Sequence, residues 1–271
     1  MTDFVTSLRM YSATPSLAAA WRQLFERAFA AAGLRVRFIT HGFPQPIEAL
    51  WSEPMLCADF MCGWPFVRSV RGMQPIAVPV PAPPPYRGLS RYRSEFLVRA
   101  ASGWDLLEQT FGHRIGWMAE DSQSGFNAPR ALLARHATSR RAALYARSVG
   151  PFVTPARTLE ALHSDKVDVA AIDGFYLDLV RHADPAALAG IRTIAATPWT
   201  PMPLLVAGPG VDARVVAALR SRFVALHIDP ACRPLLASVL LKRFDVPDVT
   251  RYAALVAMER RAVRRGYASI R

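Results

Sequence analysis

Apolar side chains recur at helical spacing near the start of the chain. They stand three or four positions apart at Leu17, Trp21, Leu24, Phe25 and Ala28. This spacing puts them on one face of a helix, which Ser16 can cap and Gly33 can end, so we predict a helix over residues 16–32. Residues 8–11 before it and 35–39 after it have the pattern of strands, and the three segments together predict a βαβ unit.

The first series of elements continues into a proline-rich segment. A helical piece is predicted over residues 47–51, and strands are predicted over 56–61 and 76–80. The last strand runs into Pro79, Pro81, Pro83, Pro84 and Pro85. Because proline favours extended backbone and has no amide hydrogen to donate, we expect this segment to be an exposed loop.

A second series of alternating elements begins at Glu95. The pattern predicts strands over 96–99, 114–118, 167–172 and 191–195, and helices over 104–110, 125–135, 155–163 and 175–181. The final part of the chain adds a strand over 204–207 and helices over 213–226, 230–236 and 251–265. Strands that alternate with helices predict mostly parallel sheets, flanked by helices on both faces.

Two such series are too long for one compact sheet, so the predicted fold class is α/β with two lobes. We expect residues 1–91 and 199–271 to form the first lobe and residues 92–198 to form the second. The chain would cross between the lobes twice, near 91–94 and 195–201. In this arrangement the last third of the chain returns to complete the first lobe.

The composition is that of a folded protein with a strongly basic balance. Of the 271 residues, 52% are hydrophobic and 20% are charged, which excludes general disorder. The formal net charge of +12 could attract nucleic acid, an anionic membrane or a small anion. The arginines are scattered without a nucleic-acid-binding motif, and no apolar run reaches the roughly 20 residues that span a bilayer. We therefore expect neither a nucleic-acid partner nor direct membrane insertion.

The chain lacks the motifs that mark a catalytic or cofactor-binding site. Its six histidines form no HExxH motif, and no histidine–cysteine cluster has zinc spacing. There is also no GxGxxG motif and no P-loop. We therefore expect no catalytic residue, no metal and no cofactor.

A pair of serines stands where a strand is followed by a helix. Ser122 and Ser124 lie between the strand that ends at Met118 and the helix predicted from Gly125. The amide end of a helix attracts anions, and two hydroxyls with several amides can surround a tetrahedral oxyanion. Gly125 would let the backbone approach closely. The alternative is that one serine only caps the helix.

Other candidate ligand contacts follow the strands of the first lobe. Tyr11 and Ser12 stand between the first strand and the first helix, where parallel sheets leave a crevice. Tyr11 could equally pack beneath the loop while Ser12 caps the helix. Trp64 follows the strand over 56–61 and could cover an organic ligand or lie at the edge of the core.

Four motifs carry a resemblance to a known family. They are Tyr92-x-Ser94 at the start of a strand, Asp121-Ser122-Gln123-Ser124-Gly125, Val167-Asp168-Val169-Ala170-Ala171-Ile172-Asp173, and Thr197-Pro198-Trp199. In order and spacing, over roughly residues 8–225, the chain resembles the phosphonate-binding family of substrate-binding proteins. These proteins serve ABC transporters that take up phosphate, phosphite or phosphonates.

The resemblance implies a type 2 periplasmic-binding-protein fold and a function in transport. It implies a monomer that captures a small anionic ligand, bearing a phosphonate, phosphate or other oxyanion, in the cleft between its lobes for an ABC-transporter permease. Tyr92 and Ser94 would contact the ligand at the first crossing. Asp173 would receive a ligand amine or else cap the following helix, and Trp199 would close over the ligand or stiffen the hinge.

The sequence departs from the family in one segment and leaves two points open. Where many members carry Gly-Ser-His, this chain has Gly150-Pro151-Phe152, which favours a carboxylate, a sulfonate or a larger aromatic anion. The resemblance implies the periplasm, but the start Met1-Thr2-Asp3 has no signal-peptide pattern, so the cytoplasm stays open. The alternative function is a cytosolic enzyme on the same fold, of the menaquinone- or thiamine-precursor-synthesis type, acting on a carboxylate or phosphate-bearing substrate.

Overall fold

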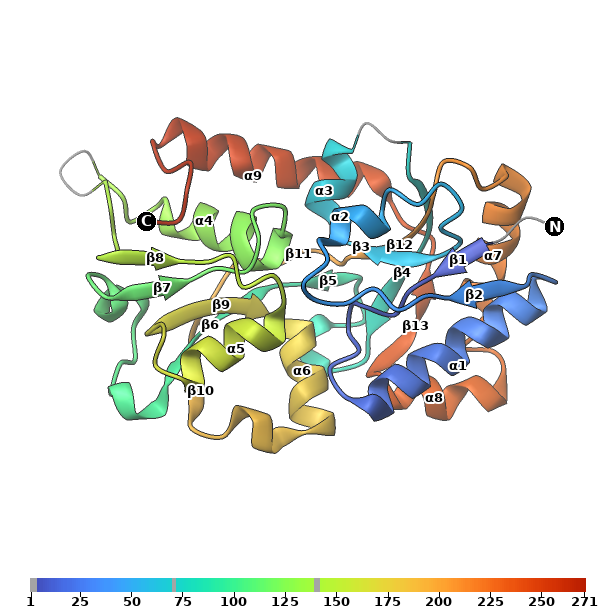
Figure 1. Ribbon diagram of the computed structural model, residues 1–271, viewed down its shortest axis with the longest axis horizontal. Helices are drawn as coiled ribbons and strands as arrows, with labels where there is room; N and C mark the ends of the chain where they lie inside the picture. Colours follow the sequence, from blue (N-terminus) through green and yellow to red (C-terminus); the bar gives the residue numbers. More distant parts are fainter. Residues whose placement is uncertain (1–3, 70–71, 139–141) are drawn as a thin grey trace. The chain divides into compact units, whose positions relative to one another are not determined.

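The chain folds into two compact units, each made of two stretches of sequence (Figure 1). The computed structural model describes residues 4–69, 72–138 and 142–271, so the Met1-Thr2-Asp3 start lies outside the described residues. Unit 1 comprises Met1–Arg91 and Pro201–Arg251, and unit 2 comprises Tyr92–Thr200 and Tyr252–Arg271.

Unit 1 contains an antiparallel sheet in the order β13-β4-β12-β3 and a parallel pair, β1-β2. Its elements are β1 (Phe4–Thr6), α1 (Pro15–Ala31), β2 (Val36–Phe38), α2 (Ile47–Leu50), β3 (Asp59–Met61), α3 (Gly63–Arg68), β4 (Gln74–Pro81), η1 (Pro84–Tyr86), β12 (Leu204–Ala207), α7 (Ala213–Ala225), η6 (Pro230–Cys232), α8 (Arg233–Ser238) and β13 (Leu241–Asp245). The short η7 (Val249–Tyr252) leads out of it.

Aromatic rings hold α1 and α7 together in the core of unit 1. Phe25 of α1 meets Phe223 of α7 edge to face, with ring centroids 5.2 Å apart, and Trp21 meets Phe60 of β3 at 5.3 Å. Phe223 in turn lies 5.4 Å from Phe244 of β13. Edge-to-face pairs at these separations add to the stabilisation from burying the rings. The apolar face predicted for residues 16–32 is therefore the face that α1 buries.

The proline-rich segment is partly a buried strand, so the expectation of an exposed loop was wrong for its first two prolines. Pro79 and Pro81 belong to β4, where they pair with Phe244 and Leu241 of β13. The ladders on both sides of β4 contain register shifts, and such irregular positions do not require every amide hydrogen. Only beyond Pro81 does the chain leave the sheet, with Pro84 and Pro85 exposed.

Unit 2 is built on one five-stranded sheet in the order β10-β6-β9-β7-β8. Its elements are β6 (Ser94–Arg99), η2 (Ala100–Ser102), η3 (Leu107–Thr110), β7 (Arg114–Gly116), the π-helical η4 (Gln123–Asn127), α4 (Ala128–Leu133), β8 (Arg147–Val149), α5 (Pro155–His163), β9 (Val169–Asp173), α6 (Gly174–Ala183), η5 (Pro185–Leu188), β10 (Ile191–Ala196) and α9 (Ala253–Arg264). The paired strands β5 (Arg91–Tyr92) and β11 (Thr200–Pro201) contain the residues at which the chain passes from one unit to the other.

The α/β class holds in both units, but the expected mostly parallel pairing does not. In unit 2, β7 runs parallel to β8 and β9, whereas β6 runs antiparallel to β9 and β10. In unit 1 the four-stranded sheet is antiparallel throughout. The strands by which the chain enters and leaves a unit run in opposite directions and lie in the same sheet, which an alternating strand and helix pattern does not reveal.

The end of the chain lies in unit 2, whereas we expected residues 199–271 to complete the first lobe. Pro201–Arg251 belong to unit 1, but the final helix α9 packs on α4 and η4 (Figure 1). The backbone amide of Leu144 donates to the carbonyl of Arg271 at 2.8 Å. An amphipathic helix shows in its sequence that one face is buried, but not which neighbour covers that face.

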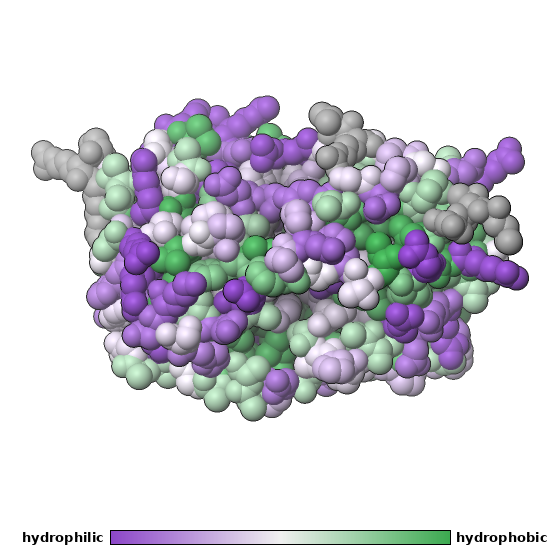
Figure 2. Space-filling model, viewed as in Figure 1, coloured by the Kyte–Doolittle hydropathy of each residue, from purple (hydrophilic) through white to green (hydrophobic). Residues whose placement is uncertain are grey.

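Hydrophilic side chains are spread over the visible face of each unit (Figure 2). Several of the basic ones are engaged in ion pairs at the surface of unit 2. Arg114 donates to both carboxylate oxygens of Asp168, and Arg99 donates to Asp168 and to the carbonyls of Leu162 and Val167. These bonds fasten the starts of β7 and β9 and the end of β6, so the network stabilises the sheet.

We predict that this network makes unit 2 sensitive to acid. Hydrogen bonds from Arg114 lower the pKa of Asp168 to about 2, below the roughly 3.9 of an unfolded aspartate. Its stabilisation is therefore present above about pH 4 and is lost as the pH falls through the folded pKa of about 2. The free energy of unfolding of the wild type should exceed that of Asp168→Asn by roughly 1 kcal/mol at neutral pH after solvent screening. Chemical denaturation at a series of pH values should show this difference shrinking on acidification, and a constant difference would contradict the prediction.

Candidate ligand-binding site

The serine turn, residues 122–125, begins the helix formed by η4 and α4 in unit 2. Its first residue, Ser122, caps this helix, because its hydroxyl oxygen accepts a hydrogen bond from the amide of Gly125 at 2.9 Å. The amide of Met118 donates to the carbonyl of Gly125 at 3.3 Å. A Cβ atom on Gly125 would lie 2.5 Å from the Cβ of Met118, so glycine is required for this close approach.

Ser124 is held in the serine turn through its backbone. Its carbonyl accepts a hydrogen bond of 2.7 Å from the hydroxyl of Ser94, which is itself buried. Ser94 is fixed in turn by Thr197, whose hydroxyl oxygen accepts from the Ser94 amide at 2.9 Å. The hydroxyl of Ser124 has no hydrogen-bond partner among the residues that the structure describes. Ser94 is thus a positioning residue, and Ser124 keeps its hydroxyl for another partner.

The first turn of this helix offers donors that the helix itself does not use. Amides at the start of a helix have no carbonyl partner within the helix. The Ser122 hydroxyl accepts a hydrogen bond from only one of them, the amide of Gly125. The helix begins two residues earlier than predicted, at Gln123, and its first turn is π-helical. Such turns are frequent at functional sites. The amides of Gln123 and Ser124 and the hydroxyl of Ser124 therefore form a compact group of donors.

Asp173 ends β9 opposite Ser94 on β6. One of its carboxylate oxygens accepts from the amides of Phe175 and Tyr176, at 2.8 and 3.0 Å, so Asp173 caps α6. This is the structural role that we left open beside that of receiving a ligand amine. The structure thus brings Ser94, Ser122, Ser124, Gly125 and Asp173 together in one part of unit 2.

Tyr92 and Trp199 lie next to the positions where the chain enters and leaves unit 2. The side chain of Tyr92 is fully buried, and its carbonyl accepts from the hydroxyl of Thr200 at 3.4 Å. Trp199 is partly exposed, and the guanidinium of Arg93 lies 4.9 Å from the centre of its ring. The expected ligand contacts of both residues stay predictions.

The segment Gly150-Pro151-Phe152 runs beside the strand end that leads to the serine turn. The amide of Phe152 donates to the carbonyl of Trp117 at 3.2 Å, and that of Val153 donates to Met118 at 2.8 Å. The Phe152 ring is buried and would lie 3.1 Å from a Cβ on Gly116. Its ring therefore belongs to the core of unit 2, which removes the reason for favouring a larger aromatic ligand.

In unit 1, Tyr11 and Ser12 lie in the loop between β1 and α1. The predicted strand is displaced toward the start of the chain, at Phe4–Thr6, and Thr14 caps α1 in place of Ser16. Tyr11 has a left-handed backbone with φ of 65°, its carbonyl accepts from the Trp21 indole at 3.2 Å, and its ring is buried against Phe60. The Ser12 hydroxyl is buried and has no partner among the described residues.

Trp64 lies on the short helix α3, which the sequence pattern did not predict. Its side chain is buried, and the guanidinium of Arg68 lies 4.7 Å from the centre of its ring. Trp64 is therefore part of the packing of unit 1. Its expected contact with a ligand stays a prediction.

A buried carboxyl group in unit 1 was missed from the sequence. Asp59 accepts hydrogen bonds from the amides of Ser7 and Phe60, at 3.0 and 2.7 Å, and burial raises its pKa well above the usual range. Through Ser7 it holds the start of the loop that carries Tyr11 and Ser12. The only signal in the sequence is one acidic residue inside an otherwise apolar strand.

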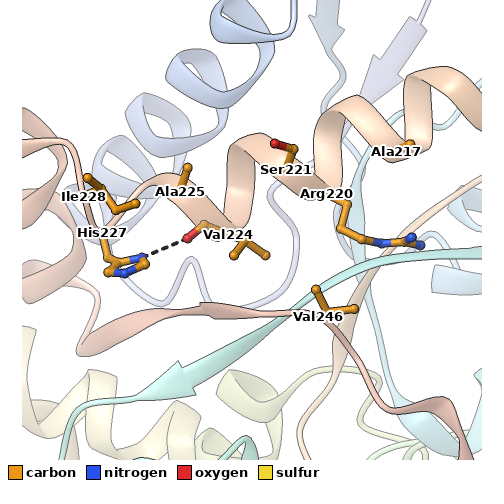
Figure 3. A pocket seen from close by; sticks show the side chains of 8 residues that line it. All are labelled: Ala217, Arg220, Ser221, Val224, Ala225, His227, Ile228 and Val246. Atoms are coloured by element: carbon orange, nitrogen blue, oxygen red, sulfur yellow. Dashed lines mark hydrogen bonds between the residues drawn. The ribbon is translucent and has the colours of Figure 1, made fainter.

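A surface hollow of about 440 Å³ lies on unit 1 beside α7 (Figure 3). Its lining is mostly apolar, with Val224, Ile228 and Val246 exposed to it, and contains none of the predicted contacts. Arg220 also borders it, but its guanidinium donates to the carbonyls of Pro75 and Ile76. The other polar side chains of its lining are Ser221 and His227.

Within residues 4–69, 72–138 and 142–271 there is neither a cluster of metal-ligating side chains nor a candidate membrane-spanning helix. These residues contain no group of three or more histidine, cysteine, aspartate or glutamate side chains that could hold a metal ion. None of their helices has both the length and the apolar character that a bilayer requires.

Comparison with solved structures identifies the fold. A binding-protein component of an ABC phosphonate transporter from Pseudomonas aeruginosa is 16% identical, with a TM-score of 0.81 over 97% of this chain and 87% of that chain. PhnD1 from Prochlorococcus marinus, solved with methylphosphonate, is 15% identical, with a TM-score of 0.76 over 95% and 97%. XAC2383 from Xanthomonas citri, solved with ATP, is 20% identical, with a TM-score of 0.68 over 98% of both chains. The expected two-lobed periplasmic-binding-protein fold is confirmed.

The sequence itself identifies the family. No curated protein sequence is similar enough to this chain to count as a relative. However, a family model described as the periplasmic substrate-binding protein of ABC phosphonate transporters matches residues 14–252. This match does not support the alternative of a cytosolic enzyme of precursor synthesis, and it ends before α9. Since it covers most of the chain, the protein belongs to the phosphonate-binding family of periplasmic substrate-binding proteins of ABC transporters.

Proposed function

We propose that the protein binds a small phosphonate or phosphate through the serine turn of unit 2 and delivers it to an ABC-transporter permease. The observation that carries this proposal is the hydroxyl of Ser124, which has no partner among the described residues and stands beside the first-turn amides. Hydrogen bonds to a charged acceptor contribute about 1.5 to 3 kcal/mol each. Three such donors suffice for submillimolar to micromolar binding without a cationic side chain.

In unit 1, Ser12 is the residue that we propose for a polar contact with a ligand. A buried hydroxyl without a partner costs about 1 to 3 kcal/mol, which a ligand oxygen would relieve. The left-handed backbone of Tyr11 directs the loop at this position, and the Trp21 indole holds its carbonyl. Ser12 therefore supports binding through a polar contact in unit 1.

The choice of a small oxyanion follows from the family and from the segment at Gly150. PhnD1 of Prochlorococcus marinus was solved with methylphosphonate, and the same ligand class suits the donors of the serine turn. With Phe152 in the core, residues 150–152 present neither a hydroxyl nor an imidazole to a ligand. We infer a ligand of few atoms that is recognised mainly through its oxyanion oxygens.

We propose a monomer in the periplasm, with a transporter permease as its protein partner and no nucleic-acid partner. The family of ABC-transporter binding proteins supports this compartment and this partner. The protein would return its ligand chemically unchanged.

We predict that Ser124→Asp abolishes binding, because the added carboxylate repels the oxyanion. Isothermal titration calorimetry with methylphosphonate and with inorganic phosphate should show Kd at least about 100-fold higher, and Ser124→Ala should raise it about tenfold. Ser148→Asp is the matched control, since it adds the same charge to an exposed position on β8. Unchanged affinity in Ser124→Asp would remove the serine turn as the binding site.

We predict that Gly125→Ala weakens both folding and binding. The new methyl group would meet Met118, and overpacking of this kind costs about 1 to 3 kcal/mol. Thermal unfolding should show a lower midpoint, and calorimetry should show weaker phosphate binding. Gly42→Ala is the control, because nothing lies within 4 Å of that added atom. Equal effects of the two substitutions would contradict the required close approach.

We predict that the protein does not alter its ligand. Mass spectrometry of methylphosphonate and of a chorismate-like carboxylate after long incubation should find each compound unchanged. Buffer without protein gives the background rate of decay. A product that accumulates in proportion to protein concentration would instead indicate an enzyme.

A further inference from the structure

Three polar side chains on one side of the serine-turn helix face the end of the chain. They are Gln123, Asn127 and Arg130, at the helical spacing of four and three residues. All three are buried, Gln123 and Asn127 completely. Buried polar groups need partners, because an unsatisfied one is costly. Their partners come largely from the C-terminal segment, Tyr252–Arg271.

Asn127 connects the start of the helix to α9. Its amide nitrogen donates to the side-chain oxygen of Gln123 at 2.8 Å and to the carbonyl of Leu255 at 3.2 Å. Gln123 in turn places its own amide nitrogen 3.6 Å from the sulfur of Met258. Since Gln123 lies between Ser122 and Ser124, these bonds act on the serine turn itself.

Arg130 extends the same chain of bonds to the last residues. Its guanidinium donates to the side-chain oxygen of Asn127 and to the carbonyl of Ala268, both at 2.8 Å. The guanidinium also lies 5.1 Å from the centre of the Phe126 ring. A planar guanidinium can bridge two acceptors in this way, whereas a lysine ammonium on a flexible stem does so poorly.

The far end of the C-terminal segment is itself anchored. The carbonyl of Arg271 accepts from the Leu144 amide at 2.8 Å and from the Tyr267 hydroxyl at 2.6 Å. The guanidinium of Arg271 donates to the carbonyl of Ala142 at 3.2 Å. The segment is thus fixed to unit 2 near its start, where Asn127 donates to Leu255, and at its end, where Arg130 donates to Ala268 and Arg271 is anchored. Figure 1 shows its helix α9 beside α4.

We propose that the C-terminal segment holds the serine turn in its binding geometry through Gln123, Asn127 and Arg130, which are positioning residues for the ligand. This inference rests on the proposed function. A site of hydrogen-bond donors binds tightly only when the donors are ordered before the ligand arrives. Ser122 provides a single capping bond, and the side chain of Gln123 orients the residues on either side. The family match ends at Tyr252, so it covers Gln123, Asn127 and Arg130 but not residues 253–271, which supply their partners.

The test compares substitutions that cut the segment's bonds at two places. Arg130→Met removes the bonds to Asn127 and Ala268 while keeping an apolar stem, and Gln123→Leu removes the bond to Asn127 and the contact with Met258. The matched control is Arg265→Met, which removes a 3.4 Å bond from the same segment to Ala134 at the other end of α4. Calorimetry with methylphosphonate and inorganic phosphate measures affinity, and hydrogen exchange of residues 122–126 measures the order of the unliganded turn.

We expect Arg130→Met and Gln123→Leu to weaken binding at least tenfold and to speed exchange in the serine turn. Arg265→Met should lower the unfolding midpoint without either effect, which separates positioning from general stability. If Arg130→Met does not fold, Gln123→Leu decides the question. Wild-type affinity and exchange in a folded Gln123→Leu variant would overturn the inference. Ser124→Asp then decides whether the proposed function also fails. If Ser124→Asp does not bind the ligand, the proposed function stands, and if it binds, the proposed function is overturned too.

Discussion

The close contact between Gly125 and Met118 is the constraint on which the candidate site depends. It returns the chain onto the end of β7, so that the helix formed by η4 and α4 starts directly beside the sheet of unit 2. Any side chain at position 125 would push the helix start away from that strand. With glycine there, Ser122 caps the helix and the donors around Ser124 collect in one turn.

Burial determines which of the polar residues around this turn are structural. Ser94, Thr197 and Asp173 lie in the interior of unit 2, where each must find a hydrogen-bond partner. Each does so with backbone: Ser94 with the Ser124 carbonyl, Thr197 with the Ser94 amide, and Asp173 with the first amides of α6. Ser94 and Thr197 thereby fix the backbone of Ser124 without using its hydroxyl, whereas Asp173 fixes the start of α6.

The loop after β1 in unit 1 is also held in place by buried side chains. Its start is held by the buried carboxyl of Asp59, and its middle is held by the indole of Trp21 and the ring of Phe60. These contacts maintain a left-handed backbone at Tyr11, which a bulky residue adopts only when its surroundings impose it. The buried hydroxyl of Ser12 is what remains available in this loop.

The sequence by itself determined the elements whose apolar residues recur regularly, and the motifs that mark the family. The repeating face of α1, the helix α5 at Pro155–His163 and the position of the serine turn after β7 could all be read from local spacing. Local spacing is sufficient there because a helix or a turn is formed by residues close together in the chain.

Only the tertiary structure decided that Pro79 and Pro81 lie in a buried strand, that the sheets are mixed, and that Tyr252–Arg271 belong to unit 2. It also decided that Ser94 holds Ser124 across 30 positions of the sequence and that Arg130 reaches Ala268 across 138. Pairing and burial depend on which distant segment supplies the partner, and that choice is made by packing.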